Sequence, residues 1–191
     1  MLEVEVKLQI KDKDELISAL EKDGFTKGKL LRESDSYFNS DFHDFKKCGD
    51  AFRIRRTENL ITHEKHDMIT YKGPRLTSGI KARKELETGV ENSDVMEEVM
   101  LSLGYYKVDP VVKTRQYYHN GNMTACVDSV EMLGNFLELE IVVDESVGYD
   151  EAEKKIGEKL KVLGHDLSES IKASYLTMVQ AYLEKIKNIT K

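Results

Sequence analysis

Segments in which aliphatic and charged residues alternate recur along this chain, and they constrain its fold more than any other feature. The first is MLEVEVKLQI, where an aliphatic residue stands at every even position from 2 to 10 and Glu3, Glu5 and Lys7 stand between them. A period of two predicts a β-strand with one apolar and one ionic face. The ionic face of a single strand ordinarily contacts water. The other strands therefore decide how this face is used.

The same alternation returns in seven further segments, each with ionisable groups on one face: LLRESDSYFN, AFRIRRTE, MITYKGP, GIKARKELETGV, VVKTRQYY, TACVDSV and FLELEIVV. Between the fifth and sixth of these, Asn120-Gly121 predicts a tight hairpin with antiparallel strands. Eight strands with ionic faces are hard to reconcile with eight separately solvated faces. The pattern therefore indicates that the ionic faces meet one another.

Four helices are expected around these strands. Asp12 and Glu15 resemble a capping box at the start of a helix that runs to about Lys22, and Gly104 ends a helix over residues 93–103. Two further helices are expected near residues 150–163 and 171–186. Their apolar stripes can cover the apolar faces of the strands.

The fold class predicted from these elements is α+β, as one domain over residues 1–191. The expected architecture is a closed eight-stranded antiparallel β-barrel with a charged interior and helices packed outside. Buried charges require opposite charges, water or a charged ligand. One alternative is a wall of cross-strand salt bridges that binds nothing. Because buried ion pairs add little net stability, a highly charged ligand is the favoured interpretation.

Composition excludes several partners. The chain of 191 residues has 34% charged residues but a net charge of only -6, so no basic field for nucleic-acid polymers or membranes is expected. Apolar runs are too short for a membrane span, and charge from residue 3 onward argues against a signal peptide. Cys48 and Cys126 have neither a CxxC spacing nor a disulfide pattern. A reducing, cytoplasmic setting is expected.

The ionic faces combine two kinds of chemistry. The acids are Glu3, Glu5, Asp35, Glu85, Glu87, Asp128, Glu138 and Glu140. The bases are Lys7, Arg53, Arg55, Lys72, Arg83, Lys113 and Arg115. Carboxylates two residues apart on a strand suit a hard divalent cation, whereas guanidinium and ammonium groups suit phosphate oxygens. A polyphosphate with Mg²⁺ or Mn²⁺ uses both sets, and no cysteine and histidine spacing typical of zinc is present.

At the level of motifs, Glu3-Val4-Glu5-Val6-Lys7 resembles the ExExK signature of the CYTH superfamily, the triphosphate tunnel metalloenzymes. Further pieces follow in the order of that family: DSYF, FRIRR, TYKGP, ARKELE, KTRQYY, VDSVEMLGNFLELE and IKASYLTM. The resemblance covers nearly the whole chain. By pattern, TYKGP and IKASYL are similar to the class IV adenylyl cyclase branch and its archaeal-type homologues.

The resemblance implies a role for each site residue. The metal-binding acids would be Glu3, Glu5, Asp128, Glu138 and Glu140, with Asp35, Glu85 and Glu87 in support. The triphosphate-binding cations would be Lys7, Arg53, Arg55, Lys72, Arg83, Lys113 and Arg115, of which Lys7, Lys72 and Arg115 would be catalytic. Lys172, Ser174 and Tyr175 match the late motif and would serve packing and closure.

Three functions remain open. A class IV-like adenylyl cyclase would convert ATP to cyclic AMP and pyrophosphate, whereas a triphosphatase would hydrolyse thiamine triphosphate, a nucleoside triphosphate or tripolyphosphate. Glu140 departs from the cyclase pattern, which has a small residue there, and Glu85 and Glu87 also resemble the triphosphatase branches. A non-catalytic polyphosphate or nucleotide binder is the third interpretation. Apolar outer strands could also favour a homodimer.

Overall fold

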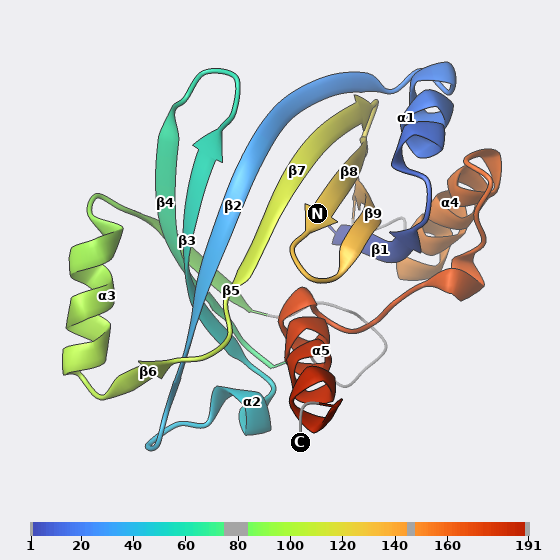
Figure 1. The fold of residues 1–191 in the computed structure, drawn as a ribbon. Coiled ribbons are helices and arrows are strands. Elements are labelled where there is room, and N and C mark those ends of the chain that lie inside the picture. The colour runs from blue at the N-terminus through green and yellow to red at the C-terminus, as the bar shows by residue number, and fades with distance from the viewer. Residues whose placement is uncertain (1, 75–83, 145–147, 190–191) are drawn as a thin grey trace. The chain divides into compact units, whose positions relative to one another are not determined.

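A computed structural model describes residues 2–74, 84–144 and 148–189. In chain order, the elements are β1 (Leu2–Ile10), α1 (Lys13–Lys22), β2 (Thr26–Ser40), α2 (Phe45–Cys48), β3 (Ala51–Asn59), β4 (Lys65–Lys72), β5 (Glu85–Val90), α3 (Ser93–Ser102), β6 (Tyr105–Lys107), β7 (Val111–Asn120), β8 (Met123–Val130), β9 (Gly134–Val143), α4 (Tyr149–Val162), the 3₁₀ helix η2 (Leu167–Glu169) and α5 (Tyr175–Ile189) (Figure 1). Helices and strands alternate irregularly, which confirms the α+β class.

The strands form one antiparallel sheet in the order β1-β9-β8-β7-β2-β3-β4-β5, and β6 pairs with β2. The hairpin predicted at Asn120-Gly121 is confirmed, since β7 and β8 pair from Asn120 opposite Met123. Gly121 has a φ of 60°, a left-handed conformation that glycine adopts without strain. The local turn signal therefore fixed this connection correctly.

The prediction of a closed eight-stranded barrel is wrong. The sheet has nine strands, and no ladder between β1 and β5 closes its order within the described residues. Closure requires the terminal strands to exchange backbone hydrogen bonds. The carbonyl of Lys7 in β1 instead accepts a hydrogen bond from the backbone N–H of Ile171 at 2.8 Å. At the other end of the order, β5 has only six residues, nearly all exposed.

Two of the four predicted helix starts are confirmed by their caps. The Asp12 carboxylate accepts hydrogen bonds from the backbone N–H groups of Asp14 and Glu15, and the Asn92 side chain caps α3 in the same way. The last helix begins at Tyr175 rather than near residue 171, because the residues before it follow an extended path beside β1. No helix in the described ranges is long and apolar enough to span a bilayer.

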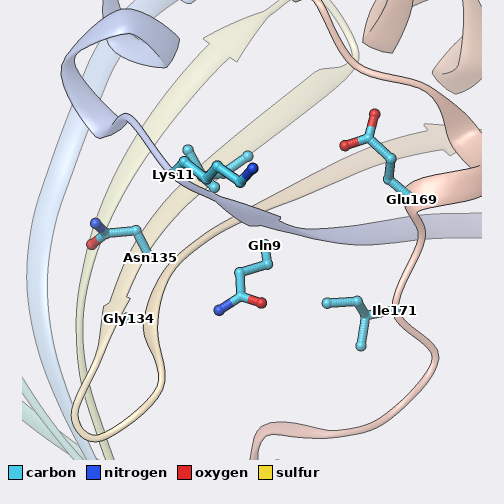
Figure 2. A pocket seen from close by; sticks show the side chains of 7 residues that line it. Gln9, Lys11, Gly134, Asn135, Glu169 and Ile171 are labelled. Atoms are coloured by element: carbon cyan, nitrogen blue, oxygen red, sulfur yellow. The ribbon is translucent and has the colours of Figure 1, made fainter.

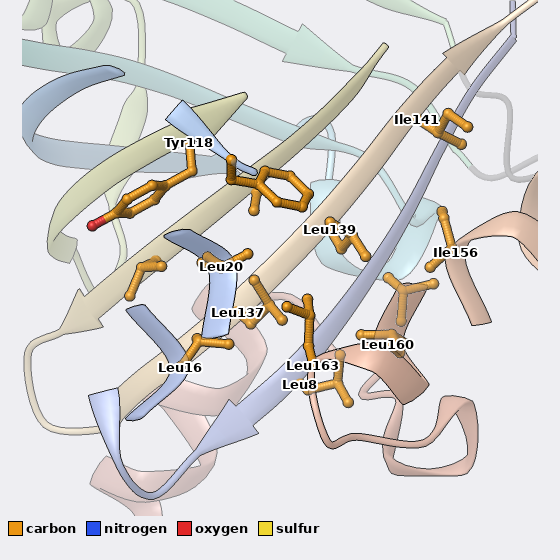
Figure 3. Packing of buried hydrophobic residues seen from close by; sticks show 14 of the residues in the cluster. Leu8, Leu16, Leu20, Tyr118, Leu137, Leu139, Ile141, Ile156, Leu160 and Leu163 are labelled. Carbon is orange, nitrogen blue, oxygen red and sulfur yellow. The ribbon is translucent and has the colours of Figure 1, made fainter. Parts of the chain in front are cut away.

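The chain divides into two compact units: unit 1 comprises Met1–Leu30 and Lys113–Ser174, and unit 2 comprises Leu31–Val112 and Tyr175–Lys191. In unit 1, α1 and α4 pack on the apolar face of the sheet, where Leu8, Leu137 and Leu139 are fully buried (Figure 3). Leu20 of α1 and Ile156 of α4 join this core. The apolar side of the alternation in β1, β8 and β9 thus contacts helices, and the ionic side is left facing away from them.

Unit 2 repeats this division of faces. Phe38 of β2, Ile54 of β3 and Met100 of α3 are buried together, and Phe52 and Tyr105 pack against them. Arg56 of β3 also contacts α3, since its guanidinium donates to Asp94 at 2.8 Å. The polar residues of β2 to β5 that were expected in the site occupy the opposite face of these strands.

Candidate active site

The ionic face of unit 1 is assembled by strand register. Lys7 of β1 lies opposite Glu138 of β9, and Arg115 of β7 lies opposite Asp128 of β8. Residues directly opposite one another in an antiparallel pair share a face, so alternation in each sequence segment carries over into one continuous surface. Lys113 lies two residues before Arg115 on the same face. The predicted acids and bases of these four strands therefore come together.

Asp128 organises the cations of unit 1. Its side chain is fully buried, its Oδ1 accepts from Arg115 Nε at 2.7 Å, and its Oδ2 accepts from Arg115 Nη2 at 2.6 Å. Lys113 Nζ donates to the same Oδ2 at 3.2 Å. Burial alone would lower the pKa of Arg115, but the hydrogen bonds and charge of Asp128 raise it well above its usual value. Because both Asp128 oxygens hold cations, this residue positions Lys113 and Arg115.

Glu138 connects Arg115 to the first strand. Its carboxylate accepts a hydrogen bond from Arg115 Nη2 and lies 3.3 Å from Lys7 Nζ. Burial would raise the pKa of Glu138, but the positive charges of Arg115 and Lys113 outweigh that effect and lower it. Lys7 Nζ also donates to the carbonyl of Ala173 at 3.3 Å. Glu138 is thus ionised at neutral pH and Lys7 is held from two directions.

Glu5 and Glu140 lie directly opposite each other on β1 and β9. Opposed carboxylates repel one another across a sheet. The Glu5 side chain is exposed to solvent, but partial desolvation by the surrounding protein raises the pKa of its carboxylate, and the negative charge of Glu138 raises it further, against the lowering effects of Lys7 and Arg115. Two opposed carboxylates beside Glu138 form an oxygen-only donor set, which fits a hard divalent cation such as Mg²⁺ or Mn²⁺.

Unit 2 carries a second cluster on β2 and β3. Arg55 Nε and Nη2 donate to the two oxygens of Asp35 at 2.6 and 2.8 Å, and Arg55 Nη1 lies 3.0 Å from Glu33 Oε2. Arg53 Nη1 donates to Asp35 Oδ2 at 3.1 Å, whereas the buried Arg53 Nε has no hydrogen-bond acceptor among the described residues. Burial and the charge of Asp35 raise the pKa of Tyr37 beside them. Asp35 therefore orients two guanidinium groups.

On β4 and β5, the predicted residues pair across the strands. Lys72 Nζ lies 2.7 Å from Glu85 Oε1, and the Thr70 hydroxyl donates to Glu87 Oε2 at 2.8 Å. Thr70 is buried, whereas Glu85 and Glu87 are exposed. A partly exposed ion pair contributes little stability, so Lys72 can exchange its partner at low cost.

Two predicted residues are not placed by these contacts. Glu3 belongs to β1 opposite Val142, but its side chain lies outside the described part, as does Arg83 entirely. Of the late motif, Lys172 and Ser174 are exposed, and the buried Tyr175 begins α5. The expectation that this motif serves packing and closure stays a prediction.

Sequence reasoning missed other members of these faces. Glu33 was not selected for the site, although it alternates in step with Asp35 and contacts Arg55. Cys126 is buried opposite Glu138, and burial raises the pKa of its thiol to about 12. Alternation alone could have found both residues. The contact of Lys7 with the Ala173 carbonyl has no sequence signal, because 166 residues separate them.

A shallow groove lies elsewhere in unit 1, at the end of β1. Gln9, Lys11, Asn135, Glu169 and Ile171 are among the residues that line it (Figure 2). None of the predicted site residues lines this groove. The candidate site is therefore defined by the ionic strand faces.

An antiparallel sheet with helices on its apolar face and a register-matched array of acids and bases on the other defines the class to which this protein belongs. The chain is a member of the CYTH domain family, whose family model matches residues 1–175. The resemblance found in the motifs is thereby confirmed.

Relatives match along almost the whole chain. The "Putative adenylate cyclase MJ0240" of Methanocaldococcus jannaschii is 34% identical over 178 residues, which cover 93% of this chain and 98% of that protein. "Adenylate cyclase CyaB" of Aeromonas hydrophila is 24% identical and covers 95% of this chain and 90% of its own.

Solved structures share the fold. The PH1819 protein of Pyrococcus horikoshii OT3 superposes with a TM-score of 0.81 at 32% identity, covering 96% of this chain and 99% of that one. A structure from Hippeastrum, named as a putative adenylyl cyclase that reveals a dominant triphosphatase activity, has a TM-score of 0.68 at 16% identity and covers 94% of this chain and 96% of its own. At that identity the likeness shows the fold alone.

Proposed function

We propose that this protein is a divalent-metal-dependent enzyme that acts on a triphosphorylated small molecule, with conversion of ATP to cyclic AMP and pyrophosphate as its principal reaction. One observation carries the proposal: the opposed Glu5 and Glu140 share a strand face with Lys7, Lys113 and Arg115. Carboxylates for a metal and cations for phosphate are then available side by side. The CYTH family membership and the adenylate cyclase names of two relatives support the same assignment.

Glu5 and Glu138 would hold Mg²⁺ or Mn²⁺ directly, with Glu3 as a further acid on the same strand, and in the cyclase Glu140 would contact the ion only through water. A metal bound there would supply Lewis-acid chemistry, polarising phosphate oxygens and lowering the pKa of the attacking hydroxyl or water. Asp128, which the sequence grouped with these ligands, would instead hold Lys113 and Arg115, since both of its oxygens accept from them.

The cations would bind the phosphate oxygens. Arg115 presents a planar donor group whose orientation is fixed by Asp128, and Lys7 is fixed by Glu138 and the Ala173 carbonyl. Such preorganised donors stabilise charge that develops during reaction without having to reorganise. In unit 2, Arg53, Arg55 and Lys72 would supply the same chemistry, and Arg53 Nε, a buried donor with no acceptor among the described residues, suits an anion.

In the cyclase reaction, the ribose 3′ oxygen forms a bond to the α-phosphorus while the bond from that phosphorus to the oxygen bridging to the β-phosphate breaks. Pyrophosphate leaves with the negative charge, and the hydroxyl proton is lost to solvent. Lys7, Lys113 and Arg115 would stabilise the charge on the leaving group. Thr70 and the acids of β5 lie beside Lys72 and would orient that cation.

Triphosphatase activity is the second candidate. Water would attack the terminal phosphorus, and orthophosphate would leave the remaining diphosphate. Glu140 favours this reaction, because it adds a carboxylate opposite Glu5 where the cyclase pattern has a small residue. Glu85 and Glu87 on β5 favour the same reaction, because they also resemble the acids of the triphosphatase branches.

Phosphorus-31 NMR of the products tests the assignment. The protein is incubated with Mg²⁺ or Mn²⁺ and with ATP, thiamine triphosphate or tripolyphosphate in turn. Pyrophosphate together with cyclic AMP from ATP is expected. Orthophosphate without a cyclic nucleotide from every nucleotide would establish the triphosphatase instead. No turnover of any substrate with either metal, together with retained binding, would reduce the protein to a polyphosphate or nucleotide binder.

A further inference from the structure

We propose that His43, Cys48 and Asp50 form a second metal site, for a borderline-soft divalent ion such as Zn²⁺. One ligand atom from each residue lies within 4.8 Å of the others. All three residues belong to unit 2, in the connection between β2 and β3. The nitrogen, sulfur and oxygen donors differ from the oxygen set of Glu5 and Glu140, so the site is independent of the proposed catalytic function.

The local backbone brings the three side chains together. Asp44 caps the single turn of α2, and Cys48 ends that turn. Gly49 then adopts a left-handed conformation with a φ of 78°, and the backbone N–H of Asp50 returns to the carbonyl of Phe45 at 3.0 Å. This reversal turns the chain back on itself directly after Cys48. The spacing of five and then two residues is irregular in sequence, which explains why no zinc pattern was recognised there.

Asp50 supplies a second, independent observation in favour of this site. Only 3% of its side chain is exposed, and its Oδ2 accepts from the Tyr71 hydroxyl at 2.9 Å and lies 3.0 Å from His43 Nε2. Its buried Oδ1 has no hydrogen-bond partner among the described residues. An unsatisfied buried carboxylate oxygen is costly and calls for a donor, a water or an ion. A metal at Oδ1 would satisfy this atom while Oδ2 keeps its bond from Tyr71.

His43 and Cys48 complete the coordination set. The His43 backbone is held by hydrogen bonds in both directions with Ser40 at 3.0 Å, and its ring packs edge-on against Phe45 at 4.5 Å between centroids. Its Nε2 already points at Asp50. Cys48 is exposed, which leaves a path for metal entry.

Charge and geometry favour this metal class. A neutral imidazole, a thiolate and a carboxylate together neutralise a divalent ion, and water can fill the fourth tetrahedral position. Binding requires loss of the Cys48 thiol proton and transfer of His43 Nε2 from Asp50 to the metal. The tyrosine bond to Asp50 then fixes the orientation of the ligating carboxylate, as outer hydrogen bonds do in other metal sites.

Cobalt(II) titration of the whole metal-free protein tests the site, because a thiolate bound to Co²⁺ gives a charge-transfer absorption band in the near ultraviolet. We expect one Co²⁺ per chain with this band, displaced by Zn²⁺. Cys48→Ser should abolish the band; because Cys48 is exposed, this variant should fold normally. Tyr71→Phe should weaken binding by about 10-fold to 100-fold while the band persists.

Matched controls separate this site from the other cysteine and from surface histidines. Cys126→Ser and His63→Gln should leave the band and the affinity unchanged, since Cys126 is buried in unit 1 and His63 lies on an exposed turn. Absence of the band at saturating Co²⁺, a band that survives Cys48→Ser, or a band lost in Cys126→Ser alone would each overturn the assignment. Unchanged affinity in both His43→Gln and Asp50→Asn would do so as well.

Discussion

At the scale of single residues, the pKa of Glu5 links the acids of the site to the stability of the fold. Desolvation by the surrounding protein and the negative charge of Glu138 raise its pKa above the ordinary value of 4.5. A carboxyl whose pKa is raised by folding favours the folded state while it is protonated, and this contribution is lost as the pH rises through the raised pKa. In the metal-free protein, the contribution of Glu5 to the unfolding free energy should therefore decrease as the pH rises above the usual pKa of a glutamate.

Glu5→Gln should remove that component. In EDTA, the unfolding free energy of the variant relative to the unsubstituted protein should increase as the pH rises above the ordinary pKa of glutamate. Urea denaturation at several pH values measures this difference, and a flat or falling difference would contradict the role given to Glu5. With Mg²⁺ or Mn²⁺, turnover should fall by more than the roughly 10-fold to 100-fold typical of a residue that only supports a ligand.

Asp128→Asn tests the support of the cations. The substitution leaves Lys113 and Arg115 buried with one negative charge fewer, so the unfolding free energy should decrease by about 3–5 kcal/mol. Tripolyphosphate should restore part of this loss by supplying anionic oxygens. Urea denaturation with and without the ligand measures both effects, with Glu15→Gln on the exposed surface of α1 as the control. An unperturbed Asp128→Asn protein would show that Asp128 does not hold these cations.

Glu140→Ala separates the two enzymatic candidates. For the proposed cyclase, Glu140 is a tolerated acid, and cyclic AMP formation should stay within about tenfold of the original rate, equivalent to about 1.4 kcal/mol in the barrier. For a triphosphatase, the same substitution should abolish orthophosphate release, because Glu140 would hold a second metal or the attacking water. Initial rates of both products from ATP decide between them.

At the scale of elements, the segment after η2 takes the place of a neighbouring strand at β1. Ile171 donates its backbone N–H to the Lys7 carbonyl at 2.8 Å, and the Ala173 carbonyl accepts from Lys7 Nζ at 3.3 Å. Backbone and side chain of Lys7 are thus fixed by the same segment. This segment therefore positions Lys7, which we propose binds phosphate. It also covers the free edge of β1.

Ile171→Pro should break this link. Ser170 already has an extended conformation, with φ -62° and ψ 127°, which a following proline permits. Loss of the hydrogen bond should cost about 0.5–1.5 kcal/mol of stability and also weaken tripolyphosphate binding. Ile171→Ala, which keeps the N–H, is the matched control for binding measured by calorimetry. Equal affinities of the two variants would confine the segment to a structural role.

At the scale of the whole molecule, coupling between ligand binding and folding distinguishes a ligand site from a wall of salt bridges. The chain carries 29 basic and 35 acidic residues, yet its cations are gathered on the same strand faces as its buried acids. If these faces bind a polyphosphate, ligand binding must stabilise the folded state through mass action. A purely structural array of ion pairs gives no such coupling.

Mg²⁺ with tripolyphosphate at about 100 times its dissociation constant should therefore add about 2.7 kcal/mol to the unfolding free energy. Thermal and urea unfolding with increasing ligand measure the gain. Lys7→Met should reduce it, whereas Lys65→Met at the exposed end of β4 should not. A melting temperature that is independent of tripolyphosphate would favour the wall of salt bridges.

The sequence by itself determined the elements and the faces. Period-two alternation placed Glu5, Lys7 and Glu138 on the ionic side because side-chain direction in a strand is a local property. The hairpin at Asn120-Gly121 and the cap at Asp12 are equally local, and the CYTH motifs identified the family. The single domain over residues 1–191, the cytoplasmic setting and a homodimer stay predictions.

Tertiary structure decided what depends on contacts between distant residues. Alternation is the same in an open sheet and a closed barrel, so only the bond from Ile171 to Lys7 revealed that β1 ends the sheet order beside a non-strand segment. The assignment of Asp128 to the cations likewise required its position relative to Lys113 and Arg115. His43, Cys48 and Asp50 meet only because Gly49 reverses the chain. Side-chain direction in a strand follows from the local sequence. Closure of the sheet, the ion-pair partners of a residue and the coordination of a metal depend instead on distances between remote residues, which only the folded chain fixes.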